Sequence, residues 1–258
     1  MAVAHCVLRF AAVIRLSVNV NKIATLRNSR GGHLPSVVDA VRVCIAAGAP
    51  GITVHPRADQ RHITAADVRA IAVELAPRRD TVEYNIEGDP RPDLLALVRE
   101  VRPHQATLVP VQPGEVTSQA GWPASTSTDA LRVVIDELRA LGVRSSVFVD
   151  ATIPGVELAA RVGADRIEIY TEPYARACEI GPDTARACFV QHQAVARRAL
   201  DLGLGINAGH DLDLDNLPLY RTLPGLTEVS IGHALISRAV FVGLAQVVEE
   251  YLACLRSS

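Results

Sequence analysis

The feature that most constrains the fold is a regular alternation of strand-like and helix-like segments along almost the whole chain. Short runs rich in β-branched residues alternate with longer segments of helical periodicity, and glycines recur near the predicted helix ends. Such alternation is typical of a parallel sheet whose strands are connected by helices. The predicted strands are 15–20, 51–55, 80–86, 105–109, 143–149, 165–170, 205–207 and 226–231.

Eight strands and roughly eight helices in 258 residues predict a (β/α)8 barrel. We expect one barrel domain over 15–258, preceded by an extension over 1–14. The segments after the first and sixth strands are predicted to be loops, and a single final helix is expected from 233 to about 255. An open doubly wound sheet is the main alternative, but the segment after the first strand lacks the glycine-rich dinucleotide turn of that fold.

The composition bears on which partners and which cellular compartment we expect for the protein. The formal net charge of −2 gives no reason to expect a nucleic acid or an anionic membrane surface as a partner. The five cysteines are odd in number and have no CxxC spacing, which favours a reducing compartment. Arg9 and Arg15 interrupt the apolar N-terminal stretch, so neither a membrane span nor a leader is predicted and a cytoplasmic location is expected.

Polar side chains gather where the predicted strands end. In a parallel barrel all these ends lie at one rim, where enzymes of this fold place their sites. Burying so many titratable groups without a function would cost free energy. The residues at or just beyond the strand ends are Asn19, Asn21, His55, Arg57, His62, Glu83, Asn85, Glu168, Tyr170, Asn207, His210, Gly232 and His233.

Two segments indicate an anionic ligand. In 51–64 a buried strand is followed by arginines and a second histidine, which suit a phosphate, although an ordinary solvated loop is an equal alternative from this segment alone. In 230–240 Gly232 directly follows a strand and opens a helix, whose N-terminus favours an anion. The segment 207–211 has the same form, and simple turn geometry would explain either glycine taken alone.

The proposed acid–base groups are His55, Glu83 and His210. A carboxylate in a partly desolvated pocket has a raised pKa, and histidine titrates near neutral pH. A lone histidine at a strand end is more often a core group, so the prediction depends on these residues meeting at one rim. No HxH or HExxH spacing occurs, so no metal site is predicted.

Several segments in the same order resemble the pyridoxine 5′-phosphate synthase family. They are VNVNKIATLRNSRG (18–31), AGAPGITVHPRADQRHIT (47–64), NAGHDL (207–212) and SIGHALISRAV (230–240). The resemblance implies a (β/α)8 barrel that condenses 3-amino-2-oxopropyl phosphate with 1-deoxyxylulose 5-phosphate to pyridoxine 5′-phosphate, inorganic phosphate and water. It also implies small phosphorylated substrates, no cofactor, and a homo-oligomer, typically an octamer.

The resemblance assigns roles to residues of this sequence. His55 and Glu83 match the proton acceptors of the family, and His210 matches its proton donor. The positions that match contacts to the amino-ketone phosphate are Asn19, Arg30, Gly232 and His233. The positions that match contacts to deoxyxylulose phosphate are Asn21, Lys22, Arg57, His62 and Thr117, and Asp211 follows the proton donor.

The chain departs from the usual family pattern at Asn21-Lys22, Tyr170, Glu172 and Asp211. A family Asp-His stands where this chain has Asn21-Lys22, and a family glycine where it has Asp211, so the departures fall on the sugar-reading part. Three hypotheses therefore stay open: a working pyridoxine phosphate synthase, a paralogue that uses another carbonyl substrate, and a phosphate-binding barrel without turnover.

Overall fold

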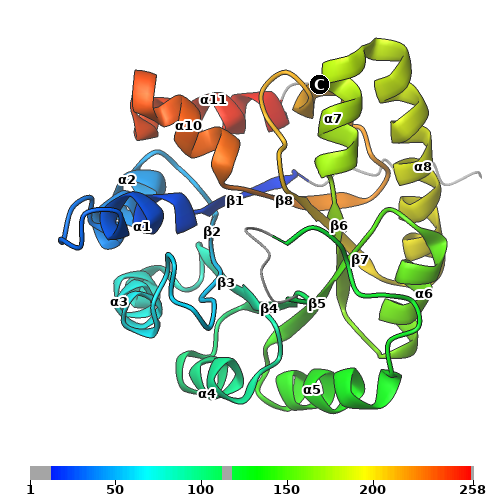
Figure 1. Ribbon diagram of the computed structural model, residues 1–258, viewed down its shortest axis with the longest axis horizontal. Helices are drawn as coiled ribbons and strands as arrows, with labels where there is room; N and C mark the ends of the chain where they lie inside the picture. Colours follow the sequence, from blue (N-terminus) through cyan, green and yellow to red (C-terminus); the bar gives the residue numbers. More distant parts are fainter. Residues whose placement is uncertain (1–12, 112–117, 257–258) are drawn as a thin grey trace, which may run out of the picture.

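Eight parallel strands close into a barrel in a computed structural model that describes residues 13–111 and 118–256. Each strand pairs with the next, and β8 pairs with β1, so the predicted (β/α)8 barrel is confirmed. The helices surround the barrel (Figure 1). The strands are β1 (Arg15–Asn19), β2 (Gly51–Val54), β3 (Glu83–Gly88), β4 (Gln105–Leu108), β5 (Arg144–Val149), β6 (Arg166–Tyr170), β7 (Gly205–Gly209) and β8 (Leu226–Ile231).

The helices of the described residues follow the strands in sequence. Before β5 they are α1 (Asn21–Asn28), α2 (Val37–Ala46), α3 (Ala65–Leu75), the short 3-10 helix η1 (Ala76–Arg78), α4 (Pro92–Val101) and α5 (Thr128–Ala140). After β5 they are α6 (Ile153–Arg161), α7 (Glu172–Ile180), α8 (Pro182–Asp201), α9 (Leu217–Tyr220), α10 (His233–Val242) and α11 (Leu244–Arg256). Over 13–111 and 118–256, no helix is both long and apolar enough to cross a bilayer.

The alternation of side chains along each strand separates the protein into two layers. In a strand, successive side chains point to opposite faces. On β2 and β3 the apolar Ile52, Val54, Tyr84 and Ile86 belong to the large hydrophobic core packed against the helices. The residues between them face the inside of the barrel and are polar, so the interior carries hydrogen-bonding groups from one end to the other.

Hydrogen bonds connect these inward-facing groups across neighbouring strands. The hydroxyls of Ser17 and Thr53 lie 2.6 Å apart, and Asn85 Nδ2 donates to Thr53 Oγ1 at 3.3 Å. Thr107 Oγ1 in turn donates to Asn85 Oδ1 at 3.1 Å. Because these residues sit at equivalent levels of β1 to β4, the network holds the barrel wall rigid just below the strand ends.

One predicted strand has the wrong bounds, and two segments predicted to be loops are helices. The third strand begins at Glu83 and ends at Gly88, whereas 80–86 was predicted. The segment after β1 is a helix, which the sequence concealed because Ala24 is the only buried residue on it. The segment after β6 is also a helix, with its proline in the first turn, where proline is tolerated.

The predicted final helix is two helices. Gly243 ends α10 with a φ of 91°, a conformation that glycine adopts without strain. The helix α11 then packs against α10 and α2. This break returns the chain to the barrel surface after α10 has covered the end of β8.

A reciprocal cap fixes the start of α3, just beyond the polar loop that follows β2. Thr64 Oγ1 accepts from the backbone N–H of Asp67 at 3.2 Å, and Asp67 Oδ2 accepts from the N–H of Thr64 at 2.8 Å. Arg27 of α1 forms an ion pair with the same carboxylate at 2.5 Å. The loop carrying Arg57 and His62 is therefore anchored at its far end.

Thr64→Ala should lower the free energy of unfolding by about 1 kcal/mol, because it removes one side of the capping box. In a chain of this size that corresponds to a decrease of about 2–4 °C in Tm. Urea unfolding and thermal scans measure both quantities. Thr64→Ser retains the hydroxyl and is the matched control, so equal losses in the two variants would contradict the capping role.

Candidate active site

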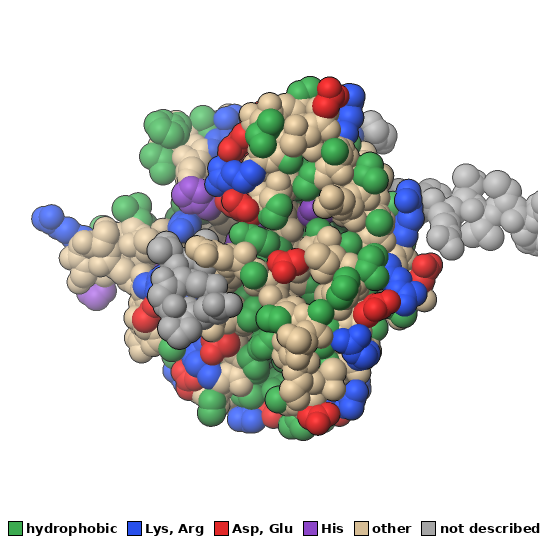
Figure 2. Space-filling view, turned by 45° about the vertical axis from the view of Figure 1, so that its right-hand side comes forward, with side chains coloured by type: hydrophobic (Ala, Val, Ile, Leu, Met, Phe, Trp, Pro, Cys, Tyr) green, Lys and Arg blue, Asp and Glu red, His purple; other side chains and the backbone are tan. Residues whose placement is uncertain are grey.

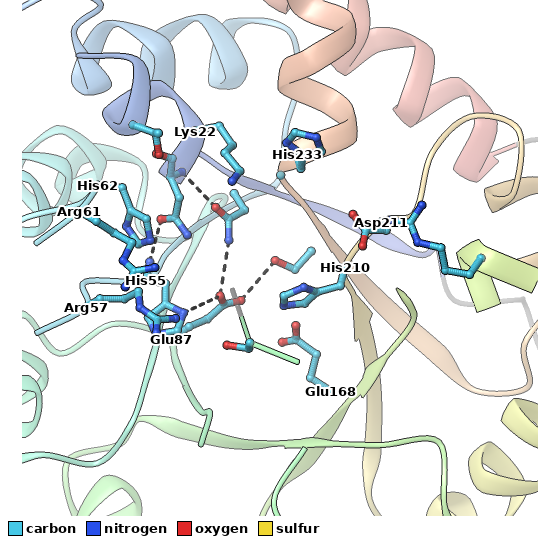
Figure 3. A pocket seen from close by; sticks show the side chains of 17 residues that line it. Lys22, His55, Arg57, Arg61, His62, Glu87, Glu168, His210, Asp211 and His233 are labelled. Atoms are coloured by element: carbon cyan, nitrogen blue, oxygen red, sulfur yellow. Dashed lines mark hydrogen bonds and ion pairs between the residues drawn. The ribbon is translucent and has the colours of Figure 1, made fainter. Parts of the chain in front are cut away.

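A cavity of about 420 Å³ opens at the carboxyl ends of the strands. Asn19 of β1, Glu87 of β3, Glu168 of β6 and Ser230 of β8 line it, together with residues of the loops that follow the strands and of helices α1, α7 and α10. Figure 3 shows Glu87 and Glu168 among these side chains. The structure brings most of the predicted site residues to this cavity. They are Asn19, Asn21, Lys22, His55, Arg57, His62, His210, Asp211, Gly232 and His233.

His55 and Glu87 form a buried pair on one wall of the cavity. His55 Nδ1 lies 4.0 Å from Glu87 Oε2, and both side chains are less than a tenth exposed. Asn19 Nδ2 at 3.5 Å and Ser230 Oγ at 3.4 Å donate to the two Glu87 oxygens. His55 Nε2 is buried and makes no hydrogen bond within the described residues. A buried polar atom without a partner is rare in folded proteins and is suited to receive a ligand.

Burial moves the pKa values of this pair in opposite directions. It raises the pKa of Glu87 to about 8, with a further increase from the charge of Glu228 and an opposing effect of the Ser230 hydrogen bond. It holds the pKa of His55 well below its ordinary value, and the cationic forms of His62 and Arg57 add to this effect. At neutral pH the pair therefore holds a proton on the carboxyl and a neutral imidazole, so that one acid and one base lie side by side.

A second carboxyl lies on the floor of the cavity. Burial raises the pKa of Glu168 well above its ordinary value, and the neighbouring charges of Glu87 and Glu228 raise it further. Thr107 Oγ1 donates to its Oε2 at 3.5 Å. A Cβ at Gly209 would lie only 2.5 Å from Glu168 Oε1, so the glycine at the end of β7 provides the space that this carboxyl occupies.

His210 lies on the opposite wall from His55 and Glu87 (Figure 3). Its ring contacts the rings of Phe148 and Tyr170, with centroid distances of 5.3 Å to each. Burial lowers the pKa of His210, while the charge of Asp211 raises it. The cavity thus has titratable groups on both sides of the space that a substrate would occupy.

Asn21 connects the start of α1 to the wall of the cavity that carries His55. Its Oδ1 accepts from the backbone N–H of His55 at 2.9 Å, and its own N–H donates to Asn19 Oδ1 at 3.0 Å. An amide oxygen accepts this hydrogen bond as a carboxylate oxygen would. The replacement of the usual family aspartate by asparagine therefore preserves the contact that positions the end of β2.

Groups suited to an anion lie above this floor. Arg57 is buried, and Arg61 and His62 lie beside it on the loop after β2. Gly232 precedes α10, whose first turn has no side-chain cap and no acidic residue. A Cβ at Gly232 would lie 3.1 Å from the Cβ of Asn19, so a larger residue there would require Asn19 to shift. These features leave backbone N–H groups available at the rim of the cavity.

The prediction that Glu83 meets the two histidines is wrong. Glu83 begins β3 at the opposite end of the barrel, where Arg144 Nη2 donates to it at 2.5 Å and Arg15 Nη1 lies 3.5 Å away. Glu83 and Glu87 both face the interior, but four residues of strand separate them by about 13 Å. The arginines hold the pKa of Glu83 below its ordinary value, although burial opposes them, so Glu83 is an ion-paired structural carboxylate.

Two other predicted contacts are not found at the cavity. Arg30 follows α1 in an exposed position and does not line the cavity. Thr117 lies outside the described residues. The sequence assigned no role to Glu87, Ser230 and Arg176, which line the cavity as well. It placed Glu168 at the rim without a role and Arg61 on the loop suited to a phosphate, and both line the cavity. Glu83 and Glu87 both face the barrel interior, and Glu87 is the one next to Gly88, where β3 ends. A sequence reading that placed the end of β3 at Gly88 would have selected Glu87 as the residue at the rim.

The described residues contain no group of three histidine, cysteine, aspartate or glutamate side chains arranged to hold a metal ion. Acidic and basic side chains are intermixed over the face shown in Figure 2, and no extended surface of one charge is visible there. The charged and titratable side chains that line the cavity include the carboxyls of Glu87, Glu168 and Asp211, together with the imidazoles and the cationic side chains described above.

The fold and the cavity define an enzyme of the (β/α)8-barrel class, equipped for acid–base chemistry on an anionic ligand. The chain belongs to the family described as "Pyridoxal phosphate biosynthesis protein PdxJ", whose model matches residues 16–257. It is 51% identical to pyridoxine 5′-phosphate synthase of Bacteroides thetaiotaomicron over 94% of this chain and 99% of the relative. It is 53% identical to that of Xanthomonas axonopodis pv. citri over 94% of this chain and 97% of the relative.

Solved structures with little sequence identity share the fold. Tryptophan synthase of M. tuberculosis superposes with a TM-score of 0.61 at 13% identity, covering 95% of this chain and 93% of the other. Phosphoribosyl anthranilate isomerase of Thermus thermophilus superposes with a TM-score of 0.58 at 15% identity, covering 94% and 98%. These similarities concern the barrel architecture only.

The raised pKa of Glu87 predicts a pH dependence of stability. The unfolded chain ionises Glu87 near its ordinary pKa of about 4.3, whereas the folded chain ionises it near about 8. Folding therefore becomes less favourable as the pH rises between these values. Urea unfolding of wild type and Glu87→Gln should show the variant gaining relative stability up to about pH 8, with no further gain above it. A stability difference that does not change with pH would contradict the raised pKa.

Proposed function

We propose that the chain is a pyridoxine 5′-phosphate synthase, which condenses 3-amino-2-oxopropyl phosphate with 1-deoxy-D-xylulose 5-phosphate to pyridoxine 5′-phosphate, inorganic phosphate and water. The observation that carries the proposal is the combination of full-length relatives of that name with a cavity whose buried acid–base groups lie between anion-binding ends. Ring formation needs a Schiff base, dehydrations, loss of phosphate and a carbon–carbon bond. Each of these steps moves protons.

In this proposal His55 and Glu87 exchange protons with one face of the condensing substrates. The neutral His55 accepts a proton through Nε2, the atom that has no partner within the described residues. Glu87, whose Oε2 lies 4.0 Å from His55 Nδ1, delivers or recovers a proton. Glu87 thus takes the role that the family resemblance had assigned to Glu83, because it is the β3 glutamate that reaches the cavity.

His210 acts from the opposite wall as the proton donor to a departing oxygen. Glu168 lies on the floor between the two walls, where burial favours its protonated form, so that it can donate a hydrogen bond or a proton to the substrate. Because acid–base groups lie on two opposite walls of the cavity, successive proton transfers can occur without rotation of the intermediate.

Two anion sites hold the substrates by their phosphate groups. The start of α10 at Gly232 and His233, beside Asn19, receives the amino-ketone phosphate. Arg57 and His62 receive the phosphate of the second substrate. Binding energy from the phosphates then orients the reacting carbons. Asp211 borders the first site, and Arg176 also lines the cavity and lies in reach of an anion there.

The proposed reaction is tested by supplying both substrates to the purified protein and following pyridoxine 5′-phosphate by mass spectrometry. Sustained formation of that product supports the proposal. If the amino-ketone phosphate is consumed only with another carbonyl compound, the chain is a paralogue with a different second substrate. That alternative is considered because Lys22 and Asp211 depart from the usual family residues. Binding of both substrates without product would indicate a barrel that has lost turnover.

Glu87→Gln and Glu83→Gln make a matched pair, since the same substitution is placed at two levels of one strand. Glu87→Gln should lower kcat by about 10²–10⁴-fold, the usual contribution of a general acid–base group. Glu83→Gln should leave kcat within about threefold of wild type, while lowering stability because Arg144 and Arg15 lose their charged partner. Steady-state kinetics and urea unfolding measure the two effects, and the reverse order of kcat values would refute the assignment.

The homo-oligomer that the resemblance implies remains a prediction. Val240 and Phe241, at the end of α10, are 71% and 87% exposed, and adjacent exposed apolar side chains are suited to a subunit contact. Sedimentation of wild type and Phe241→Ser should show an assembly that the substitution weakens. A monomeric wild-type protein would exclude it.

A further inference from the structure

The turn that carries His210 has an unusual backbone. His210 and Asp211 directly follow β7 with φ values of 81° and 56°. Residues other than glycine adopt this left-handed region rarely, because the Cβ then approaches the backbone. Such conformations persist only where surrounding contacts hold them, and they occur preferentially at functional sites. The contacts that hold this turn are therefore of interest for the position of His210.

Thr171 supplies the first of these contacts. Its Oγ1 donates to the carbonyl of Gly209 at 2.6 Å and to the carbonyl of His210. Its backbone N–H also donates to the carbonyl of Gly209, at 3.0 Å. Thr171 is completely buried and precedes α7, where a threonine hydroxyl would ordinarily accept from the helix N-terminus. No such cap is formed here, because the hydroxyl is directed to the turn.

Asn216 supplies a second contact, from the segment before α9. Its Nδ2 donates to the carbonyl of Asp211 at 3.0 Å. The side chain is itself fixed, since Oδ1 accepts from the N–H of Asp213 at 3.0 Å. Tyr174 of α7 donates to its backbone carbonyl at 2.9 Å. The carbonyls of His210 and Asp211 are thus each held by a buried side chain from outside the turn.

The His210 ring has no comparable hydrogen bond of its own. No partner for either imidazole nitrogen occurs within residues 13–111 and 118–256. The rings of Phe148 and Tyr170 contact the imidazole at centroid distances of 5.3 Å. The direction of the ring therefore depends on the backbone that carries it and on these two aromatic side chains.

We propose that Thr171 is a positioning residue for the reaction, which acts by holding the strained His210–Asp211 turn so that the His210 ring faces the cavity between Phe148 and Tyr170. Thr171 does not itself line the cavity, and its hydroxyl reaches the site through the carbonyls of the turn. The kinetic part of this inference rests on the proposed function, whereas the structural part does not.

The pKa of His210 provides a second measurement, because burial and several charged groups act on it. Burial lowers its pKa, Asp211 and Glu172 raise it, and Lys22 lowers it. His55 faces it across the cavity, and Tyr170 packs against the ring. Loosening the turn exposes the ring to water without removing any of these charges. The pKa of His210 should then rise toward its ordinary value.

The test uses Thr171→Val, which removes the hydroxyl and keeps the shape, and Thr171→Ser, which retains the hydroxyl. Thr227→Val is the matched control, because Thr227 Oγ1 makes the same kind of bond to the carbonyl of Ile206 at 2.8 Å, at the far end of the β7–β8 pair. Thr171→Val should lower kcat about 10–100-fold with KM values within about threefold. Thr171→Ser should restore most of kcat, and Thr227→Val should leave kcat unchanged.

Histidine-labelled NMR follows the titration of His210, identified by its absence in His210→Gln. An upward shift in Thr171→Val alone supports the proposal, and an unmoved titration with wild-type kcat overturns it. Equal loss of kcat in Thr227→Val overturns it as well, since the effect would then be general destabilisation. If Thr171→Val does not fold, Thr171→Ala provides the same comparison. If the wild-type protein forms no product, the proposed function fails, and the His210 titration alone decides whether Thr171 holds the turn.

Discussion

Closure of the barrel is the constraint on which the other features depend. Because β8 pairs with β1, with Leu16 opposite Val229, the strands form no open edge and every second side chain is enclosed. Many enclosed polar groups find partners, and at the N-terminal end of the strands Glu83 pairs with Arg144. Three buried side-chain atoms of the described chain make no hydrogen bond, namely Arg15 Nε, His55 Nε2 and Ser146 Oγ. Of these three residues only His55 lines the cavity, where a ligand can reach its nitrogen.

Burial shifts the pKa values of both kinds of titratable group in the cavity. It disfavours the charged form of every titratable side chain, so it raises the pKa of Glu87 and Glu168 and lowers that of His55 and His210. For Glu87 and His55 the order of proton affinity is thereby reversed from that in water, so that the carboxyl holds a proton and the imidazole is free to accept one. An acid and a base that lie side by side at neutral pH suit a condensation with several proton transfers.

The residues in which this chain departs from the usual family pattern fit the structure without loss of the acid–base core. Asn21 makes the backbone contact that holds His55 in place. Tyr170 packs against the His210 ring and, with Phe148 and Val109, forms a small apolar cluster near the strand ends. Asp211 adopts a left-handed conformation, which aspartate tolerates better than most residues do. The departures thus change the wall of the cavity more than its floor.

The sequence by itself determined the barrel, the family, and the strand-end residues His55, His210 and Gly232, because β-branched runs, helix periods and turn glycines are local signals. It placed the end of β3 two residues too early, and that shift was enough to select Glu83 in place of Glu87. It also left α1 and α7 as loops, since their polar faces hid the few buried residues. Only the tertiary structure decided which inward-facing glutamate reaches the cavity, which arginine pairs with Glu83 and what holds the His210 turn. Those depend on the register between strands far apart in the chain, which no local pattern encodes.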